Sequence, residues 1–217
     1  MSEYIDIYDP NMVKIGTKER QQAHIDGNWH KAFHCWIIYR TPNGEDMIVV
    51  QRRSSSKKLF PNALDITAAG HYEKGETIKE GLREVQEELG LDVDFEDLIS
   101  LGVKFDVAKI GEVTNYEFDD VFLLEYFQPI EAYNFDPVEV SGIASFKIDD
   151  GLSLFSGEVD EISGKAVMAI NIEEQVHFKE EEFKIKVEDF IPRIDSYVYK
   201  VLIMAKRHLE GEKHLAI

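Results

Sequence analysis

The sequence predicts one α/β (α+β) domain in which strands and helices are mixed, followed by a C-terminal helix. Apolar and β-branched runs separated by turn residues indicate a sheet, and two segments with apolar residues at helical spacing indicate helices. The 217 residues are enough for one sizeable core, and the sequence contains no internal repeat and no evident linker. We therefore expect a single domain over 1–217, with a core at about 30–165, an N-terminal extension at 1–29 and a C-terminal helical extension at about 187–210.

The predicted sheet begins with a β-hairpin. Residues 31–40 (KAFHCWIIYR) and 47–53 (MIVVQRR) flank a Pro-Asn-Gly turn, and this turn chemistry favours a hairpin. The segment 65–70 (DITAAG) predicts a short strand that ends in a glycine bend. Two further strands are predicted at 98–110 and 114–127, because both segments are rich in β-branched and aromatic residues.

Two helices are predicted, near 77–89 and 187–210. The first ends before Gly90, a residue type that favours the C-terminal end of a helix. The second rests on apolar residues at helical spacing, namely Phe190, Ile194, Tyr197, Val198, Val201, Leu202, Ala205 and Leu209. We expect it to pack on the core or on a partner subunit. Residues 139–158 predict an irregular segment with room for a short helix.

Composition and charge narrow the classes of function. The formal net charge of −18, from 42 acidic and 24 basic residues, repels nucleic-acid backbones and anionic lipids. No apolar run approaches the roughly 20 residues needed to span a bilayer, and the N-terminus lacks the features of a secretory signal. Cys35 is the only cysteine, which fits a reducing compartment. We therefore expect a cytoplasmic protein that acts on a small molecule, with no nucleic-acid or membrane partner.

Acidic residues gather on one side of the first predicted helix. They are Glu80, Glu84, Glu87 and Glu88. The opposite side carries apolar residues that can anchor the helix to a sheet, namely Ile78, Leu82, Val85 and Leu89. Like charges four residues apart cost a helix roughly a few tenths of a kcal/mol per pair, and divalent cations, which take carboxylate and carbonyl oxygens, would offset this repulsion. The alternative is an ordinary solvated helix face.

The segment GHYEKGETIKEGLREVQEELGL at 70–91 resembles the Nudix box, the signature of hydrolases that act on a nucleoside diphosphate linked to another group. The usual form is G-x5-E-x7-R-E-U-x-E-E-x-G-U, where U is a bulky aliphatic residue. The matching residues are Gly70, Glu76, Arg83, Glu84, Val85, Glu87, Glu88, Gly90 and Leu91. Between Glu76 and Arg83 this chain has six residues in place of seven, which leaves the role of Glu76 open.

The resemblance implies an α/β/α sandwich with a mixed sheet and a site for Mg²⁺ or Mn²⁺. The implied ligands are Glu84, Glu88, Glu87 and the backbone carbonyl of Gly70. Glu87 is alternatively the catalytic base, and Arg83 would orient the glutamates through charge-assisted hydrogen bonds. The ions would neutralise diphosphate oxygens and lower the pKa of a bound water for attack at phosphorus.

A closer resemblance covers residues 24 to about 127. The segments WHKAFHCWII, QRRSSSKKLFPNALDITAAGH and NYEFDDVF are similar to the branch that contains type I isopentenyl-diphosphate isomerase and its hydrolase-like relatives. In that branch an arginine and a lysine before the box clasp a diphosphate, and Arg53 and Lys57 match them. The alternative for this pair is an exposed basic loop.

The isomerase also carries a cysteine for proton transfer immediately before its Gly-His pair. Ala69 stands at that place, and an alanine side chain cannot transfer a proton. Cys35 lies on an earlier predicted strand and is expected in the core. Isomerases also tend to carry a degraded box, whereas this chain keeps the glutamates of the box. Both departures favour hydrolysis over isomerisation.

The metal site of the isomerase itself is matched in part. His30 and His71 match its histidines, and His24 matches with a shifted spacing. Glu117 matches its downstream glutamate, while Asn115 replaces a second glutamate. A second metal site is therefore predicted to be incomplete. The alternative is that His30 and His71 are buried and hydrogen-bonded, or contact the substrate.

These patterns together predict a Mg²⁺- or Mn²⁺-dependent Nudix pyrophosphohydrolase that cleaves a diphosphate linkage in a nucleoside or other organic diphosphate. The residues assigned to catalysis are Glu87, Arg83 and Glu117. Those assigned to substrate binding are Arg53, Lys57, His30 and His71. Two alternatives stay open, an isomerase that reroutes proton transfer through Glu117 and a non-catalytic sensor of a diphosphate ligand. A homodimer through the C-terminal helix also stays open.

Overall fold

The structure is a computed structural model that describes residues 3–111, 113–172 and 175–217. The first two residues of the predicted N-terminal extension lie outside the described residues. The strands are β1 (Tyr4–Tyr8), β2 (Lys14–Glu19), β3 (Trp29–Arg40), β4 (Asp46–Arg53), β5 (Leu64–Asp65), β6 (Ala68–His71), β7 (Leu98–Ile110), β8 (Val113–Glu125), β9 (Val140–Lys147), β10 (Ile162–Ile172) and β11 (Gln175–Ile185). The helices are α1 (Arg20–Ile25), α2 (Arg83–Leu89), α3 (Ile148–Ser156) and α4 (Tyr197–Leu209), with 3₁₀ turns η1 (Glu80–Leu82), η2 (Phe95–Asp97), η3 (Ile130–Ala132) and η4 (Val187–Asp189). None of the described helices is long and apolar enough to cross a membrane.

The described strands form one 11-stranded mixed sheet with the main order β11-β10-β9-β4-β3-β1-β2. The predicted hairpin is β3–β4, and the strands predicted at 98–110 and 114–127 are β7 and β8. Strand β8 runs parallel to β3 and pairs with it along ten residue positions, from Trp29↔Tyr116 to Ile38↔Glu125. The antiparallel strand β7 extends this edge beyond β8. The short strand β6 also pairs with β3, so β3 carries the centre of the sheet.

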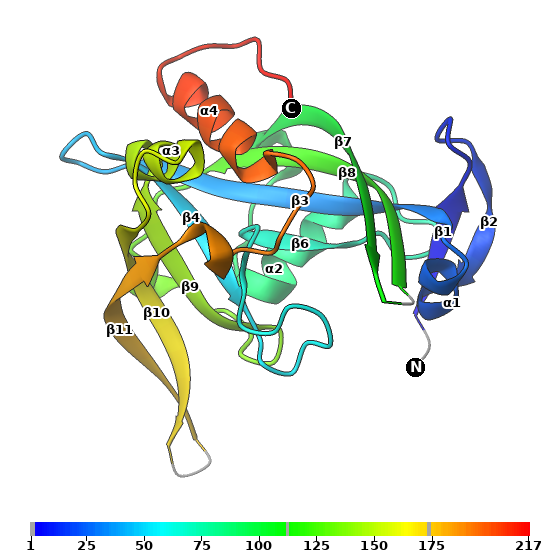
Figure 1. The fold of residues 1–217 in the computed structure, drawn as a ribbon, viewed down its shortest axis with the longest axis horizontal. Coiled ribbons are helices and arrows are strands. Elements are labelled where there is room, and N and C mark those ends of the chain that lie inside the picture. The colour runs from blue at the N-terminus through cyan, green and yellow to red at the C-terminus, as the bar shows by residue number, and fades with distance from the viewer. Residues whose placement is uncertain (1–2, 112, 173–174) are drawn as a thin grey trace.

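Helices cover both faces of the sheet, which confirms the predicted α/β/α sandwich. Figure 1 shows α3 and α4 on one side of β3 and α2 on the other. Leu154 of α3 and Leu202 of α4 belong to the core on the first face. On the second face Val85 and Leu89 of α2 pack in a core that includes Phe33 of β3. Burial of these apolar faces anchors the glutamate-rich helix to the sheet.

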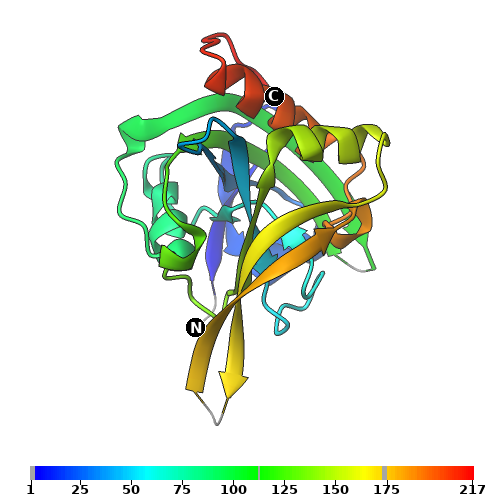
Figure 2. The same cartoon turned by 90° about the vertical axis from the view of Figure 1, so that its left-hand side faces the viewer.

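Two hairpins of the fold were not predicted from the sequence. The N-terminal extension forms the hairpin β1–β2 and the short helix α1. Strands β10 and β11 form a long hairpin that projects from the body of the molecule, as Figure 2 shows. Most residues of β11 are exposed, so this strand lacks the alternation of buried and exposed residues that identifies a strand in a sequence.

The first predicted helix is shorter than expected. Its α-helical geometry begins at Arg83, after the 3₁₀ turn Glu80–Leu82. Gly81 in this turn packs against Tyr72 and Phe33, and an added Cβ would overlap both aromatic side chains. Ile78, which was expected on the anchoring side, precedes the turn and is 40% exposed. The helix ends as predicted, with Gly90 in the left-handed region at a φ of 67°.

The C-terminal helix also begins later than expected. The 187–196 part of the prediction was wrong, because Phe190 forms a β-bridge with Leu64 and Pro192 lacks the N–H that a helix interior requires. Ile194, expected on the apolar face, is 81% exposed. From Tyr197 onward the predicted apolar face is buried, with Tyr197, Val198, Val201, Leu202 and Ala205 in the core.

Residues 139–158 contain the short helix for which the sequence left room, but they also contain a regular strand that was not expected. They contain the strand β9 and the helix α3. Strand β9 lies between β4 and β10 in the sheet, and most of its residues are buried. A strand that is buried on both faces shows no alternation in its sequence, which is why the pattern was missed.

Candidate functional site

The glutamate-rich helix α2 lies beside the short strand β6. Pairing with β3 sets Gly70 opposite Phe33 and His71 opposite Ala32. An added Cβ at Gly70 would overlap the carboxylate of Glu84. Glycine at this position therefore leaves room for the Glu84 carboxylate against the strand.

Arg83 lies at the centre of the acidic group, which we call the box glutamates (Glu76, Glu84, Glu87 and Glu88). Its Nε donates to Oε1 of Glu76 at 2.7 Å. Its Nη1 donates to Oε1 of Glu84 at 2.6 Å and to Oε2 of Glu87 at 3.1 Å. Although burial disfavours its charge, the hydrogen bond with Glu76 and the neighbouring carboxylates raise the pKa of Arg83. Glu76 thus reaches Arg83 although the box is one residue short.

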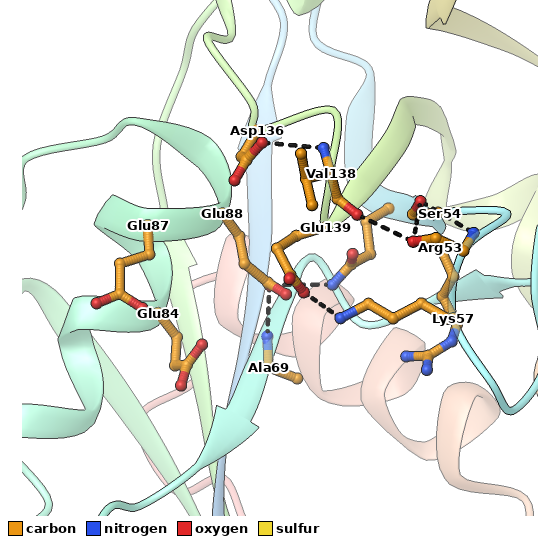
Figure 3. Close-up of polar contacts among 12 residues, drawn as sticks. Arg53, Ser54, Lys57, Ala69, Glu84, Glu87, Glu88, Asp136, Val138 and Glu139 are labelled. Carbon is orange, nitrogen blue, oxygen red and sulfur yellow. Dashed lines mark hydrogen bonds and ion pairs between the residues drawn. The ribbon is translucent and has the colours of Figure 1, made fainter. Parts of the chain in front are cut away.

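The carboxylates of α2 differ in their surroundings. Oε2 of Glu88 accepts hydrogen bonds from the backbone N of Ala69 at 3.0 Å and from Nε2 of Gln51 at 3.1 Å. Burial raises the pKa of Glu88 to about 8 and that of Glu84 to about 7. The side chain of Glu87 is 60% exposed. Figure 3 shows the three carboxylates of the helix pointing in different directions.

The two predicted phosphate-binding cations have carboxylate partners. Nη1 of Arg53 donates to Oδ2 of Asp65 at 3.1 Å. Lys57, in the loop after β4, forms an ion pair with Glu139, which precedes β9. Figure 3 shows this pair beside Glu88, and the charge of Lys57 opposes the rise in the pKa of Glu88. The structure therefore places the cationic loop next to the box glutamates.

A second group of side chains includes His71, which follows Gly70 in β6. One ligand atom from each of His24, His30, His71 and Glu117 lies within 4.8 Å of the others, and we call this group the histidine cluster. The parallel pairing of β3 with β8 sets His30 opposite Glu117. Nε2 of His71 lies 2.9 Å from Oε1 of Glu117, and Nε2 of His30 lies 3.3 Å from the same oxygen.

The protonation states of His24, His71 and Glu117 suit a transition metal. Burial lowers the pKa of His71 to about 4 and also lowers the pKa of His24. Burial opposes the ionisation of Glu117, but hydrogen bonds from His30 and His71 hold its pKa well below the usual value. Asn115, at the place of a second glutamate, donates Nδ2 to Oε2 of Glu117 at 2.6 Å. Neutral imidazoles and an ionised carboxylate are the forms that bind metal.

The two groups fit different ions by their donor chemistry. Carboxylate and carbonyl oxygens suit Mg²⁺ and Mn²⁺, whereas imidazoles suit Zn²⁺ and other transition metals. In the part of the chain that the structure describes, Asp106, Glu117 and Asp119 form one more compact group of ligand atoms, and no such compact group contains the box glutamates. The box carboxylates are instead spread around Arg83 and the backbone N–H of Ala69.

Sequence reasoning missed several polar residues near the site. Lys104 and Asp106 are buried on the inward face of β7, and their side chains lie 3.3 Å apart. Arg193 from the segment before α4 donates to Asp106 at 2.8 Å. Charged residues on the inward face of a strand were the available signal for this group. Gln51 and Glu139 carried no signal, because only the fold brings them to the box glutamates.

The cysteine and the alanine that distinguish this chain from an isomerase lie where the sequence suggested. Cys35 is buried in β3, and burial raises the pKa of its thiol. It packs in the core, in the register opposite Ala68. Ala69 contributes its backbone N–H to Glu88, and its methyl group supplies neither an acid nor a base.

Comparison with known proteins identifies the family. The family model described as NUDIX domain matches residues 28–160, more than half of the chain. The chain belongs to the Nudix family. An uncharacterized Nudix hydrolase of Clostridium acetobutylicum is 32% identical over 203 residues, which cover 94% of this chain and 96% of that protein. This similarity extends beyond the box to both terminal extensions.

Two further similarities refine this assignment. An isopentenyl-diphosphate delta-isomerase of Salmonella heidelberg is 33% identical over 93 residues, 42% of this chain and 49% of that protein. The crystal structure of DR0079 from Deinococcus radiodurans matches with a TM-score of 0.54 and 26% identity, over 71% of this chain and 90% of that one. The chain is therefore a Nudix pyrophosphohydrolase of the isomerase-related branch, which confirms the predicted family, fold and general class of enzyme.

Proposed function

We propose that this enzyme uses Mg²⁺ or Mn²⁺ to cleave the diphosphate linkage X–O–P–O–P of a small nucleoside or other organic diphosphate. The observation that carries this proposal is the position of the cationic loop beside the box glutamates (Figure 3). A diphosphate with a divalent cation brings both charges, so it can bind the carboxylates through the metal and the cations through phosphate oxygens. Such a local arrangement suits an anionic substrate in a chain of net charge −18.

The roles we propose for the box residues follow from their positions. Glu84 and Glu88 would bind the ion, with the carbonyl of Gly70 and the carboxylate of Glu87 as further ligands. When bound, the ion neutralises phosphate oxygens and lowers the pKa of water. Arg83 donates to Glu84 and Glu87 and would fix their orientation. Glu87, the most exposed of these carboxylates, is placed to accept a proton from the attacking water if it acts as base.

The remaining assignments lie outside the box. Arg53 and Lys57 would bind diphosphate oxygens. His30, His71 and Glu117 would contact the substrate or hold a second metal, and Glu117 is the alternative base. We also propose a single domain, a cytoplasmic location, a small-molecule diphosphate partner and a homodimer through α4. Sedimentation of the purified protein tests the last of these.

The central test is hydrolysis of a panel of nucleoside and isoprenoid diphosphates with Mg²⁺ or Mn²⁺. Loss of an outer partner of a metal ligand costs about 10- to 100-fold, so Glu88→Gln, which changes a ligand itself, should lower kcat/KM by at least about 100-fold. Glu80→Gln is the matched control, because Glu80 is exposed near the same helix. Hydrolysis of no compound in the panel, or full activity of Glu88→Gln, would contradict the proposal.

The histidine cluster favours one alternative, an isomerase that reroutes proton transfer through Glu117. Incubation with isopentenyl diphosphate tests it, and absence of dimethylallyl diphosphate would exclude it. A non-catalytic sensor predicts tight binding of a nucleotide or diphosphate in calorimetry without any turnover. Ala69 makes the isomerase the weaker choice, because the methyl group cannot replace the thiol of the isomerase.

A further inference from the structure

Arg53 and Lys57 have different kinds of partner, although both lie in the segment that precedes the box. Asp65, the partner of Arg53, has a side chain that is only 8% exposed and also accepts from Arg193 at 3.3 Å. The ion pair of Lys57 and Glu139 lies nearer to solvent, with side chains 31% and 45% exposed. Arg53 is therefore part of a buried network, whereas Lys57 has one accessible partner.

The backbone around Glu139 connects the box helix to the cationic loop. The backbone N of Asp136 donates to the carbonyl of Glu88 at 3.1 Å, and the N of Glu139 donates to the carbonyl of Asp136 at 3.1 Å. On the other side the N of Ser54 donates to the carbonyl of Glu139 at 3.1 Å. These bonds hold the Glu139 carboxylate between Lys57 and Glu88, as Figure 3 shows.

The two ion pairs differ in how readily a diphosphate could displace the carboxylate. Asp65 is largely buried and has a second cationic partner in Arg193, so an incoming anion cannot readily take its place beside Arg53. Glu139 is 45% exposed, and a solvent-accessible pair such as that of Lys57 and Glu139 is weak. A diphosphate carries several negative charges, so it competes well for the ammonium of Lys57. The diphosphate would leave the bond between Arg53 and Asp65 in place. It would bind the N–H groups of Arg53 that do not face Asp65.

We propose that Glu139 acts as a built-in competitor for the phosphate-binding site of Lys57. The Lys57 ammonium exchanges Glu139 for a diphosphate oxygen when substrate binds, and Glu139 takes the ammonium back when product leaves. Arg53 keeps Asp65 throughout. This inference rests on the proposed function, since it assumes that a diphosphate binds the cationic loop. Glu139 is a positioning residue here, because it acts through Lys57.

A double-mutant cycle on the full chain tests the exchange. The probe is methylenediphosphonate, which is not hydrolysed, titrated by calorimetry with Mg²⁺ present. Glu139→Gln should tighten binding about threefold to fivefold, as expected from loss of a competing pair of up to about 1 kcal/mol. Lys57→Gln should weaken binding about tenfold. In the Lys57→Gln background, Glu139→Gln should change affinity by less than about 1.5-fold.

The matched control is Asp136→Asn, which removes one negative charge from the same segment. The Asp136 carboxylate accepts a hydrogen bond from the backbone N of Val138 at 2.9 Å. An asparagine oxygen can accept the same hydrogen bond. This variant should change affinity by less than about twofold. A gain as large as that of Glu139→Gln would show a general effect of charge and would overturn the exchange.

Other outcomes also decide the proposal. An equal gain from Glu139→Gln with and without Lys57 would overturn it, and so would weaker binding by the Glu139→Gln variant. Glu139→Gln should also lower KM for any substrate found in the hydrolysis panel, whereas a merely structural role would lower kcat and the melting temperature together. If the wild type hydrolyses a diphosphate but the cycle shows no coupling, only the exchange is wrong. If no variant binds the probe and the wild type hydrolyses nothing, the proposed function fails as well.

Discussion

Gly70 and His71 are neighbours in β6, yet they serve two different groups of side chains. Successive side chains of a strand point to opposite faces. At Gly70 the lack of a side chain leaves space for the carboxylate of Glu84, and His71 places its Nε2 2.9 Å from Glu117. The same strand thus separates the box glutamates from the histidine cluster.

The two groups differ in compactness and in the partners of their carboxylates. The histidine cluster combines one carboxylate with imidazoles, and its ligand atoms lie within 4.8 Å of one another. Arg83 binds Glu84 and Glu87, and the N–H of Ala69 binds Glu88, so the carboxylates of the box point to different donors. A divalent cation would have to draw them together. The spacing of the ligand atoms alone therefore does not show which of the two groups binds a metal ion more tightly.

The largest expected difference between the groups is in the pH dependence of metal binding. Carboxylates bind metal only when deprotonated, and the pKa of Glu84 is about 7 and that of Glu88 about 8. Mn²⁺ binding to the box should therefore tighten by about 500-fold from pH 6 to pH 8, because the deprotonated fraction rises about tenfold for Glu84 and about 50-fold for Glu88. Calorimetry on the Glu117→Gln variant isolates this site. Zn²⁺ binding to the histidine cluster, measured in Glu84→Gln/Glu88→Gln, should change far less over this range, since burial lowers the pKa of His71 to about 4 and also lowers the pKa of His24.

The same pKa shifts predict the direction of a stability change. An unfolded glutamate titrates near 4.5, and burial raises the pKa of Glu84 and Glu88 in the folded protein to about 7 and 8. The folded state then holds protons that the unfolded state has released, so stability falls as pH rises through this window. Mn²⁺ should raise the melting temperature more at pH 8 than at pH 5. An equal rise at both pH values would contradict the distinction between the two groups.

The next largest effect should come from Gly70→Ala. An added methyl group would overlap the carboxylate of Glu84 and displace a proposed metal ligand. We expect hydrolysis and Mn²⁺ affinity of the box to fall by about 10- to 100-fold, as for loss of a group that positions a ligand. Gly16→Ala is the control, because its added Cβ would make only ordinary contacts with Ile7 at 3.7 Å. If Gly70→Ala keeps normal Mn²⁺ affinity and activity, the Glu84 carboxylate can move away from β6 without loss.

Local patterns predicted the strands around β3 better than the elements that depend on burial or on distant pairing. The turn at Pro-Asn-Gly and the β-branched runs identified β3, β4, β7 and β8, because these signals act within a few residues. Strand β9 was missed because burial on both faces removes alternation. The start of α4 was placed too early because the bridge between Phe190 and Leu64 joins segments distant in sequence. No local pattern reports such a pairing.

The candidate site likewise contains some residues that local spacing predicts and others that only the fold brings together. The spacing of Arg83, Glu84 and Glu88 on one helix follows from helical geometry, so the box could be predicted. The approach of His30 to Glu117 depends on the parallel register of β3 and β8, and the family resemblance supplied what spacing could not. Glu139 lies beside Glu88 only through the backbone bonds of the segment before β9. The position of Glu139 could therefore be found only from the structure.

The smallest effect should come from a substitution at Glu76, next to the place where the box is one residue short. Glu76 accepts from Nε of Arg83 at 2.7 Å and from Nη2 at 3.1 Å. Glu76→Gln leaves one carbonyl acceptor, so we expect kcat/KM to fall about fivefold, the equivalent of one hydrogen bond of ~1 kcal/mol. Glu73→Gln is the matched control, since Glu73 is an exposed glutamate in the same loop, and it should change kcat/KM by less than about twofold. Equal effects of the two substitutions would mean that the shortened loop has removed Glu76 from the site, and that Arg83 is positioned by the helix carboxylates alone.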